Sequence, residues 1–531
     1  MSTAAGERDS IKKGLLKAVS VMTLFTVVSR FLGLAREMVR AHYLGTGVAS
    51  DAFTIAFMLP NLFRRLVGEG AMVVATVPIL VDLKKDGLEA VSRAASALFT
   101  LLTFIITPFC ILFILFSGFL VEHVFARGFS DNPEKLALTV ELTRWMFFYL
   151  VFISLAAMAQ AVLNAFRVFG PSSFTPILLN ISVIACAMLF GSMFDNAAFA
   201  LALGVMIGGV LQLLWQLPYI FRLGVKLKPS FDWAMPEVRR VLKLMAPGAI
   251  GAGVYQVNIL FSEMIATYLE DGGVASLQFS ARLMEFALGV FVVAISTAVL
   301  PTLSQQFRDG DRDGLRYTLG FAVRLVAFIT IPATAGLLLI RYPLINVLFR
   351  SGEFDAHSVE MTAQAFVFHI GGLFFIGLGR VLLPGFYSMK NMVTPVKVAA
   401  FAMIVNVACC LAFFHPLAQG GIALANTVSA LAQAAVLLWI LARRVGGIDV
   451  RSLVSPLARM LAATIVMYAA GVLCAELLGL YEVQSRLLLL PLLCVEIVAC
   501  GVAFFGSAAL MRSPEVRELW RALRRRASKS A

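Results

Sequence analysis

Hydrophobic residues along this chain are gathered in long runs that are separated by short polar connections. The runs are about 20 residues long, which is the length that a helix needs to cross roughly 30 Å of hydrocarbon. They do not show the alternating apolar and polar pattern of an outer-membrane barrel strand. The pattern therefore predicts an all-α polytopic membrane protein with about fourteen transmembrane helices. The predicted spans lie near residues 14–36, 50–82, 95–120, 138–164, 174–194, 198–221, 244–269, 274–305, 317–340, 361–387, 395–414, 420–442, 457–479 and 486–511.

The polar connections predict how these helices are oriented. Every second connection is rich in lysine and arginine, as at Lys84 and Lys85 or around Lys226. The connections between them are poor in basic residues or offset them with acids, as at Glu270 and Asp271. Because basic loops stay on the cytoplasmic side, both termini are expected in the cytoplasm, which requires an even number of spans.

An internal repeat divides the predicted helices into two lobes. The stretch GTGVASDAFTIAFMLPNLFRR, from Gly45, is echoed by DGGVASLQFSARLMEF, from Asp271. This period of about 220 residues covers six predicted helices, an even number, so the two copies have the same orientation, as in transporters built from parallel repeats. The predicted domains are an N-lobe (residues 1–225), a C-lobe (residues 226–445), and two further helices with a basic cytoplasmic tail (residues 446–531).

Composition and motifs argue against an enzyme. The chain is 60% hydrophobic and 14% charged, and its net charge of +13 is mostly a signal of topology. The basic tail RALRRRASK is expected to rest on anionic membrane lipids, and a nucleic-acid role for it is the weaker alternative. The seven cysteines lie in apolar runs without CxxC spacing, and the chain has no HExxH, GxxxxGK[ST] or GxSxG motif. We therefore predict no metal, no cofactor and no nucleic-acid partner.

Several arginines fall inside the predicted membrane helices. At 1.5 Å per residue, Arg30 lies about 20 Å and Arg36 about 28 Å from Lys17, where the first span enters the membrane. Arg64 lies at a similar depth in the second span, and Arg282 lies in the eighth. An arginine at this depth costs at least about 2.5 kcal/mol on insertion scales and usually faces protein, water or a ligand.

Two interpretations of these arginines remain open. In the first, each arginine pairs with a nearby acid and only holds helices together. The pairs would be Arg36 with Glu37 or Asp51, Arg64 with Glu69, and Arg282 with Glu285. In the second, which we favour, deep basic groups outnumber deep acids because they bind an anion, and the planar fork of arginine suits phosphate.

Long sequence blocks resemble a known family. The blocks SRFLGLAREMVRAHYLGTGVASDAFTIAFMLPNLFRRLVGEGAMVVATVPIL, LNAFRVFGPSSFTPILLNIS, RLMEF and LPGFYSMKNMVTPVKVA closely resemble the MurJ (MviN) family of lipid II flippases, in the MOP transporter superfamily. The resemblance runs from about residue 15 to 440. It implies two six-helix lobes around a solvated cavity lined by spans 1, 2, 7 and 8, with spans 13 and 14 forming a groove for a polyprenyl tail.

The resemblance also implies a substrate, a location and a set of site residues. The substrate would be lipid II, the undecaprenyl-diphosphate-linked peptidoglycan precursor. Alternating access would move it from the cytoplasmic to the periplasmic leaflet of the bacterial inner membrane. We expect a monomer that contacts membrane lipids, with the membrane potential or a Na⁺ or H⁺ gradient as candidate energy sources. By resemblance, the substrate-binding residues are Arg30, Arg36, Arg64 and Arg282, the gate or ion-pair acids are Asp51 and Glu285, and Glu69 has a lesser role.

Rival functions differ in the chemistry that they require. A cation-coupled multidrug exporter of the same superfamily should place acids in its cavity, whereas this sequence places arginines there. A flippase for another polyprenyl-linked oligosaccharide is opposed only by the family-specific blocks. A non-transporting scaffold would leave the deep arginines without a ligand, and a lipid-phosphate enzyme would need a cluster of His, Asp and Glu residues that the sequence does not show.

Overall fold

The structure of the chain, a computed structural model, describes residues 2–66, 72–447, 450–483, 485–518 and 521. The described residues form α-helices joined by short turns and contain no β-strand. The expected all-α fold is therefore confirmed. The helices are grouped in two compact units, Met1–Ala275 with Ser351–Phe354 and Ser276–Arg350 with Asp355–Ala531. The two lobes predicted from the sequence repeat have other boundaries than these two units, and the lobes stay a prediction.

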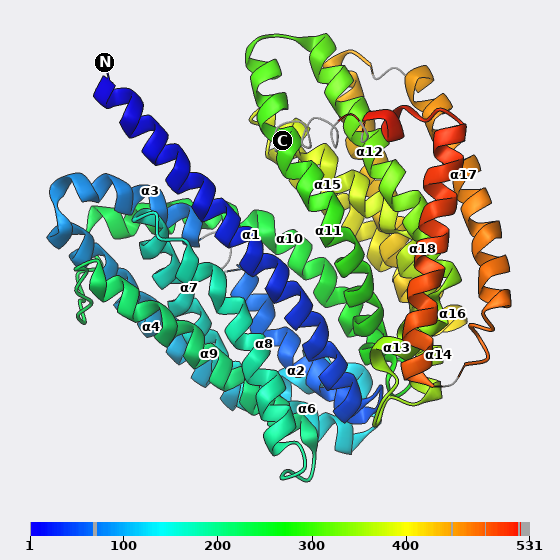
Figure 1. Cartoon of the computed structure of the whole chain (residues 1–531). Coiled ribbons are helices and arrows are strands. Elements are labelled where there is room, and N and C mark those ends of the chain that lie inside the picture. The colour runs from blue at the N-terminus through cyan, green and yellow to red at the C-terminus, as the bar shows by residue number, and fades with distance from the viewer. Residues whose placement is uncertain (1, 67–71, 448–449, 484, 519–520, 522–531) are drawn as a thin grey trace. The chain divides into compact units, whose positions relative to one another are not determined.

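In the first unit, helices pack side by side along most of their length (Figure 1). Helix α8 packs against α9 and α1, α2 packs against α6, and α7 packs against α9 and α3. The bounds are α1 (Ser2–Leu44), α2 (Val48–Arg64), α3 (Val73–Leu83), α4 (Leu88–Leu115), α5 (Ser117–Leu120), α6 (Pro133–Phe147), α7 (Tyr149–Ala165), α8 (Gly170–Phe190), α9 (Ala197–Arg222) and α10 (Pro236–Ala266).

Small residues explain the close contact between α8 and α9. Gly204 and Gly208 are one helical turn apart on α9 and face α8, where a Cβ on Gly204 would lie only 2.6 Å from the Cα of Val183. The hydroxyl of Ser182 on α8 donates a 2.9 Å hydrogen bond to the carbonyl oxygen of Gly204. A glycine pair at this spacing lets two membrane helices approach until their backbones touch.

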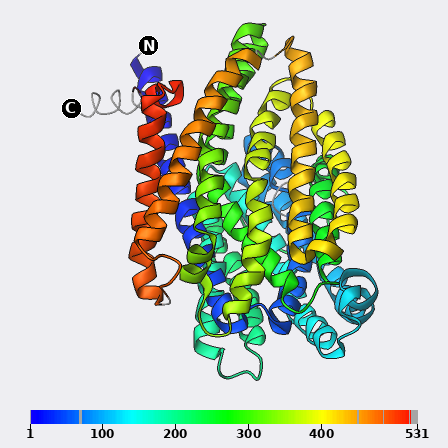
Figure 2. The same cartoon turned by 90° about the vertical axis from the view of Figure 1, so that its right-hand side faces the viewer.

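In the second unit, two apolar cores formed by described residues hold the helices. One core lies among α11, α12, α15 and α16, and the other lies where α17 and α18 pack on α12. Figure 2 shows α17 and α18, in orange and red, side by side. The bounds are α11 (Gly273–Arg308), α12 (Arg312–Leu339), α13 (Arg341–Phe349), α14 (Ala356–Gly371), α15 (Leu373–Ser388), α16 (Val393–Val445), α17 (Val450–Leu477) and α18 (Arg486–Leu510).

One predicted span in this unit is broken, and a second break lies between two predicted spans. The span near residues 361–387 is divided into α14 and α15, which meet at an angle of 44°. Helix α16 is broken at Ala418, where φ is 46° and ψ is −129°, two residues after Pro416. This break lies between the predicted spans 395–414 and 420–442. Pro416 explains the break, because proline cannot continue the helical hydrogen bonds.

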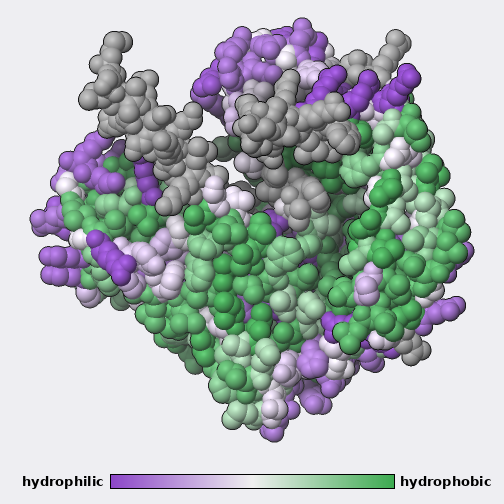
Figure 3. Space-filling model, in the orientation of Figure 1, coloured by the Kyte–Doolittle hydropathy of each residue, from purple (hydrophilic) through white to green (hydrophobic). Residues whose placement is uncertain are grey.

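The surface is that of a membrane protein. Eight helices among the described residues are long and apolar enough to cross a membrane, and α14 with α15 would make a ninth. Figure 3 shows hydrophobic residues along the flanks of the helices and hydrophilic residues at helix ends. Leu487 and Leu510, for example, are 86% and 87% exposed. Such exposure of large apolar side chains is expected where helices face lipid.

Candidate functional site

Arg36 lies in a cluster of buried charges that joins α1 to α2. Its Nη2 donates a 2.7 Å hydrogen bond to Oε1 of Glu37. Arg40 donates from Nη1 to Oε2 of Glu37 at 3.1 Å and from Nη2 to the hydroxyl of Thr54, on α2, at 3.0 Å. Arg36 is therefore paired with Glu37, one of the two partners that the structural interpretation expected. The carboxylate of Glu37 thus accepts charge-assisted hydrogen bonds from two guanidinium groups.

Arg30 differs from Arg36 in its surroundings. Its side chain is half-buried, and within the described part of the chain it has no hydrogen bond or ion pair. The backbone beside it is held in place, because the amide of Asn180, on α8, donates a 3.1 Å hydrogen bond to the carbonyl oxygen of Ser29. The helix is thus anchored while the guanidinium stays available to another group.

Asp51 lies at the start of α2 and is fully buried. Its Oδ2 is 2.7 Å from Nζ of Lys135, which lies in the first turn of α6. The same carboxylate accepts backbone hydrogen bonds from Gly272 and Ala275, at 2.8 Å and 2.7 Å, in the first turn of α11. Asp51 therefore caps α11 and joins three helices, and its ion-pair partner is Lys135 and not Arg36.

Lys135 is the residue that the sequence analysis missed. Its side chain is 2% exposed, its Nζ also contacts Oδ1 of Asp271 at 2.8 Å, and it lies 4.2 Å from the centre of the Phe129 ring. A weak signal was present in the sequence. Asn132 and Pro133 mark the start of a helix, and a lysine in its first turn opposes the helix dipole unless an acid compensates it.

The structure describes Arg64 but not Glu69. Nε of Arg64 donates a 3.0 Å hydrogen bond to Oδ1 of Asn61, one turn earlier on α2 and just past Pro60. Glu69 lies outside the described residues, so the expected pair between Arg64 and Glu69 is not tested.

Arg282 and Glu285 form an ion pair on one face of α11, as their spacing predicts. Nη1 of Arg282 is 3.0 Å from Oε2 of Glu285, and the two side chains are 35% and 43% exposed. An ion pair exposed to this degree contributes only about 0–1 kcal/mol. The contact between Arg282 and Glu285 is therefore a weak ion pair, whereas the ion pairs of Glu37 are more deeply buried.

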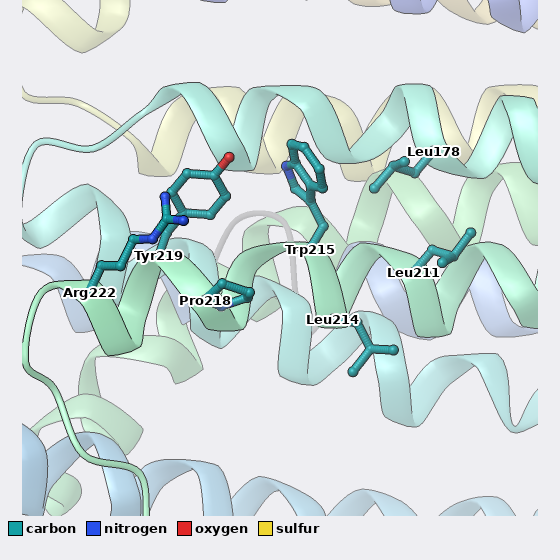
Figure 4. Close-up of a pocket in the computed structure, with 7 residues that line it drawn as sticks. All are labelled: Leu178, Leu211, Leu214, Trp215, Pro218, Tyr219 and Arg222. Atoms are coloured by element: carbon teal, nitrogen blue, oxygen red, sulfur yellow. The ribbon is translucent and has the colours of Figure 1, made fainter.

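A groove of about 420 Å³ lies on the surface of α8 and α9 and is lined by Leu178, Leu211, Leu214, Trp215, Pro218, Tyr219 and Arg222. Figure 4 shows Tyr219 and Arg222 together towards one end of the groove and the leucines towards the other. The guanidinium of Arg222 is 5.8 Å from the centre of the Tyr219 ring. None of the predicted site residues lines this groove. Among the described residues, no group of three or more His, Cys, Asp and Glu side chains is placed to hold a metal ion.

The helical membrane fold, with buried charged groups on its first helices, is that of a multi-pass membrane protein. Its fold is similar to that of a solved "Lipid II flippase MurJ, inward closed conformation", with a TM-score of 0.78, 23% identity, and coverage of 94% of this chain and 99% of that one. A multidrug resistance MATE family transporter of the MOP superfamily gives a TM-score of 0.68 at 14% identity, covering 81% of this chain and 98% of that one.

Sequence comparison identifies the family. The family model "Lipid II flippase MurJ" matches residues 40–492. "Probable lipid II flippase MurJ" of Vibrio cholerae is 35% identical over 439 residues, which are 81% of this chain and 83% of that protein. "Lipid II flippase MurJ" of Burkholderia cenocepacia is 35% identical over 421 residues, 78% of this chain and 81% of that protein. The chain belongs to the lipid II flippase MurJ family, which confirms the resemblance and makes it a transporter and not an enzyme.

Proposed function

We propose that this chain moves lipid II from the cytoplasmic to the periplasmic leaflet by alternating access, with arginines on α1, α2 and α11 binding the diphosphate. The observation that carries this proposal is the contrast on α1. Glu37 already partners Arg36 and Arg40, whereas Arg30 has no hydrogen bond or ion pair among the described residues. A guanidinium at membrane depth needs an anion, and none of the described carboxylates serves Arg30.

The chemistry of the substrate matches this need. A diphosphate carries about two negative charges, and it crosses hydrocarbon slowly because desolvation of those charges is costly. Charge-assisted hydrogen bonds from arginines offset that cost, since the planar guanidinium binds two phosphate oxygens at once. The polyprenyl tail would remain in the bilayer, in a groove formed by the last two predicted spans.

Asp51, Lys135 and Glu285 have supporting roles in this proposal. Asp51 and Lys135 hold the first turn of α11 beside α2 and α6, and this junction acts as a gate towards the outer side. Glu285 holds Arg282 until the diphosphate replaces it. Arg36 and Arg64 are further arginines proposed to bind the diphosphate, and Glu69 contributes to the charge balance near Arg64.

The finer architecture rests on the sequence patterns. We propose fourteen spans in two six-helix lobes and a C-terminal pair, with both termini in the cytoplasm of a monomer. The basic connections and the parallel repeat support this arrangement. Transport would draw on the membrane potential, which is worth about 2.3 kcal/mol per elementary charge at 100 mV, or on a Na⁺ or H⁺ gradient.

The second candidate is a flippase for another polyprenyl-linked oligosaccharide. It would use the same arginines, because the diphosphate is shared, and the sequence blocks typical of lipid II flippases favour the first candidate. A multidrug exporter is disfavoured, although its fold is similar, because arginines and not acids occupy the deep positions.

The test replaces the chromosomal copy by Arg30→Ala, Arg64→Ala or Arg282→Ala, with Arg93→Ala, an exposed arginine on α4, as the matched control. When the variant proteins reach normal levels in the membrane, cells that carry one of the three variants should lyse and accumulate lipid II in the inner leaflet. Cells that carry the control should grow and expose lipid II in the outer leaflet. Normal growth and exposure in all three variants would show that the arginines are structural. Normal exposure of lipid II together with loss of another surface polysaccharide would favour the second candidate.

A further inference from the structure

A carboxylate lies fully buried in the contact between α17 and α18. Glu496, on α18, is 0% exposed. Its Oε1 accepts a hydrogen bond from Sγ of Cys500 at 3.4 Å. Its Oε2 is also buried and has no hydrogen-bond partner among the described residues. Glu496 therefore carries a buried oxygen whose hydrogen-bonding capacity the surrounding protein does not use.

The depth of Glu496 makes this arrangement unusual. It lies ten residues after Arg486, so it is about 15 Å along α18 from the start of the helix and near the middle of the hydrocarbon core. The side chains around it on α12, α17 and α18 form an apolar cluster. An ionised carboxylate in such a place costs several kcal/mol unless a cation pairs with it.

The facing helix is shaped around this carboxyl group. A Cβ on Gly471, on α17, would lie 3.0 Å from Oε1 of Glu496, 2.8 Å from Sγ of Cys500 and 2.5 Å from Cδ2 of Leu339. Glycine at this position therefore makes room for the acid. Substitution by any larger residue would push α17 away from α18 and α12.

The titratable groups that face Glu496 do not neutralise a negative charge. They are Cys500 on its own helix, Cys474 on α17, and Tyr481 in the following connection. The hydroxyl of Tyr481 donates to the carbonyl oxygen of Leu339 at 2.9 Å. Arg341 also acts on Tyr481, and it donates to the carbonyl oxygen of Leu338 and lies over the ring of Tyr342. Thiols are weak hydrogen-bond donors, so these groups supply neither a cation nor a strong hydrogen bond to the carboxyl group.

We propose that Glu496 is a proton-binding site, occupied while α17 and α18 are packed on α12 and emptied when water enters between them. The step is the simple ionisation of the carboxylic acid, in which the O–H bond breaks and the proton passes to water. A proton suits the site better than Na⁺, because hard cations need several oxygen ligands and the neighbours here are thiols and apolar groups. The site contains none of the arginines proposed to bind the diphosphate.

Labelling with dicyclohexylcarbodiimide tests this inference, because the reagent modifies protonated carboxyl groups in apolar surroundings. The purified full-length chain is labelled at a series of pH values, and the modified residue is located by mass spectrometry. Glu496 should be modified, more strongly at lower pH, and Glu496→Gln should lose that modification. Glu515 is the matched control, because it is also buried but pairs with Arg324 at 3.5 Å and should stay unmodified.

Three results would overturn the proposal. The first is an unmodified Glu496 at every pH in a folded chain. The second is protection of Glu496 by Na⁺ at constant pH, which would assign a sodium site instead. The third is an infrared difference spectrum, between the wild type and the folded Glu496→Gln variant, that lacks the carbonyl band of a protonated acid. None of the arginines proposed to bind the diphosphate is modified in this experiment, so the inference on Glu496 can fail without affecting their proposed role.

Discussion

The ammonium group of Lys135 lies 2.7 Å from a carboxylate oxygen of Asp51, and both side chains are buried. The two residues are 84 positions apart and belong to α6 and α2. Because the same carboxylate also caps the first turn of α11, one ion pair sets the positions of three helix ends. Desolvation makes such a pair costly to form, and removal of one partner leaves an uncompensated charge in the interior.

Lys135→Met should therefore lower the free energy of unfolding by about 3–5 kcal/mol, since it leaves the Asp51 carboxylate buried without its cation. The double variant Asp51→Asn/Lys135→Met should recover a large part of this loss, because it removes both charges. Thermal unfolding of the purified protein in detergent measures both effects.

Lys85→Met is the control for that experiment, because Lys85 is exposed at the turn after α3 and should have little effect. Equal unfolding temperatures for Lys135→Met and Lys85→Met would show that the ion pair does not hold the three helices together.

Glu37→Gln should weaken the junction of α1 and α2. The carboxylate of Glu37 accepts from both Arg36 and Arg40, and each hydrogen bond to a charged group is worth about 1.5–3 kcal/mol. The amide keeps the shape but loses the charge, so the arginines would repel one another. We expect a lower unfolding temperature and loss of lipid II transport. A variant as stable and active as the wild type would show that the cluster is not structural.

Gly272→Ala should prevent stable folding of the junction. Gly272 has a φ of +91°, and an added Cβ would overlap the carbonyl oxygen of Thr46. Gly310→Ala is the matched control, because Gly310 also has a positive φ, of +70°, but has open space where the Cβ would lie. Gly310→Ala should lower the free energy of unfolding only by the cost of placing alanine in a left-handed backbone conformation, about 1–2 kcal/mol. Membrane levels of the two variants distinguish steric overlap from backbone strain, and equal levels would contradict the overlap.

Local spacing explains which contacts could be predicted. The apolar runs predicted a helical membrane fold because length and hydropathy alone are decisive in lipid. The pair Arg282 with Glu285 was foreseen because residues three apart lie on one face of a helix, and the pair Arg36 with Glu37 was foreseen because the two residues are adjacent in the sequence. Lys135 could not be assigned, because its partners Asp51 and Asp271 are 84 and 136 positions away.

Glu496 had a clear signal in the sequence, since it is the single acid in the predicted span 486–511. An isolated carboxyl group in a span does not by itself indicate a site, because a lone acid at membrane depth is compatible with several roles. That it is fully buried against Gly471 depends on how α17 meets α18, and helix packing of this kind is not encoded in the hydropathy of either helix.

The last prediction concerns the start of α14, outside the membrane-spanning segments. Asp355 is the N-cap of this helix, and its Oδ1 accepts a 2.8 Å hydrogen bond from the backbone N–H of Ser358. This hydrogen bond lowers the pKa of the Asp355 carboxyl below its ordinary value of 3.8. Because the folded pKa is the lower one, the stabilisation is complete above about pH 4 and is lost as the pH falls through the folded pKa.

Asp355→Ala should therefore cost about 1 kcal/mol near neutral pH, the usual loss for an N-cap. The difference from the wild type should shrink as the pH falls below the ordinary carboxyl pKa. Asp355→Asn is the matched variant, because asparagine caps a helix nearly as well but does not titrate, so it should keep most of the stability without this pH dependence. Unfolding temperatures measured from neutral to acidic pH separate the two effects. If Asp355→Asn lost stability with pH as the wild type does, the dependence would come from other carboxyl groups.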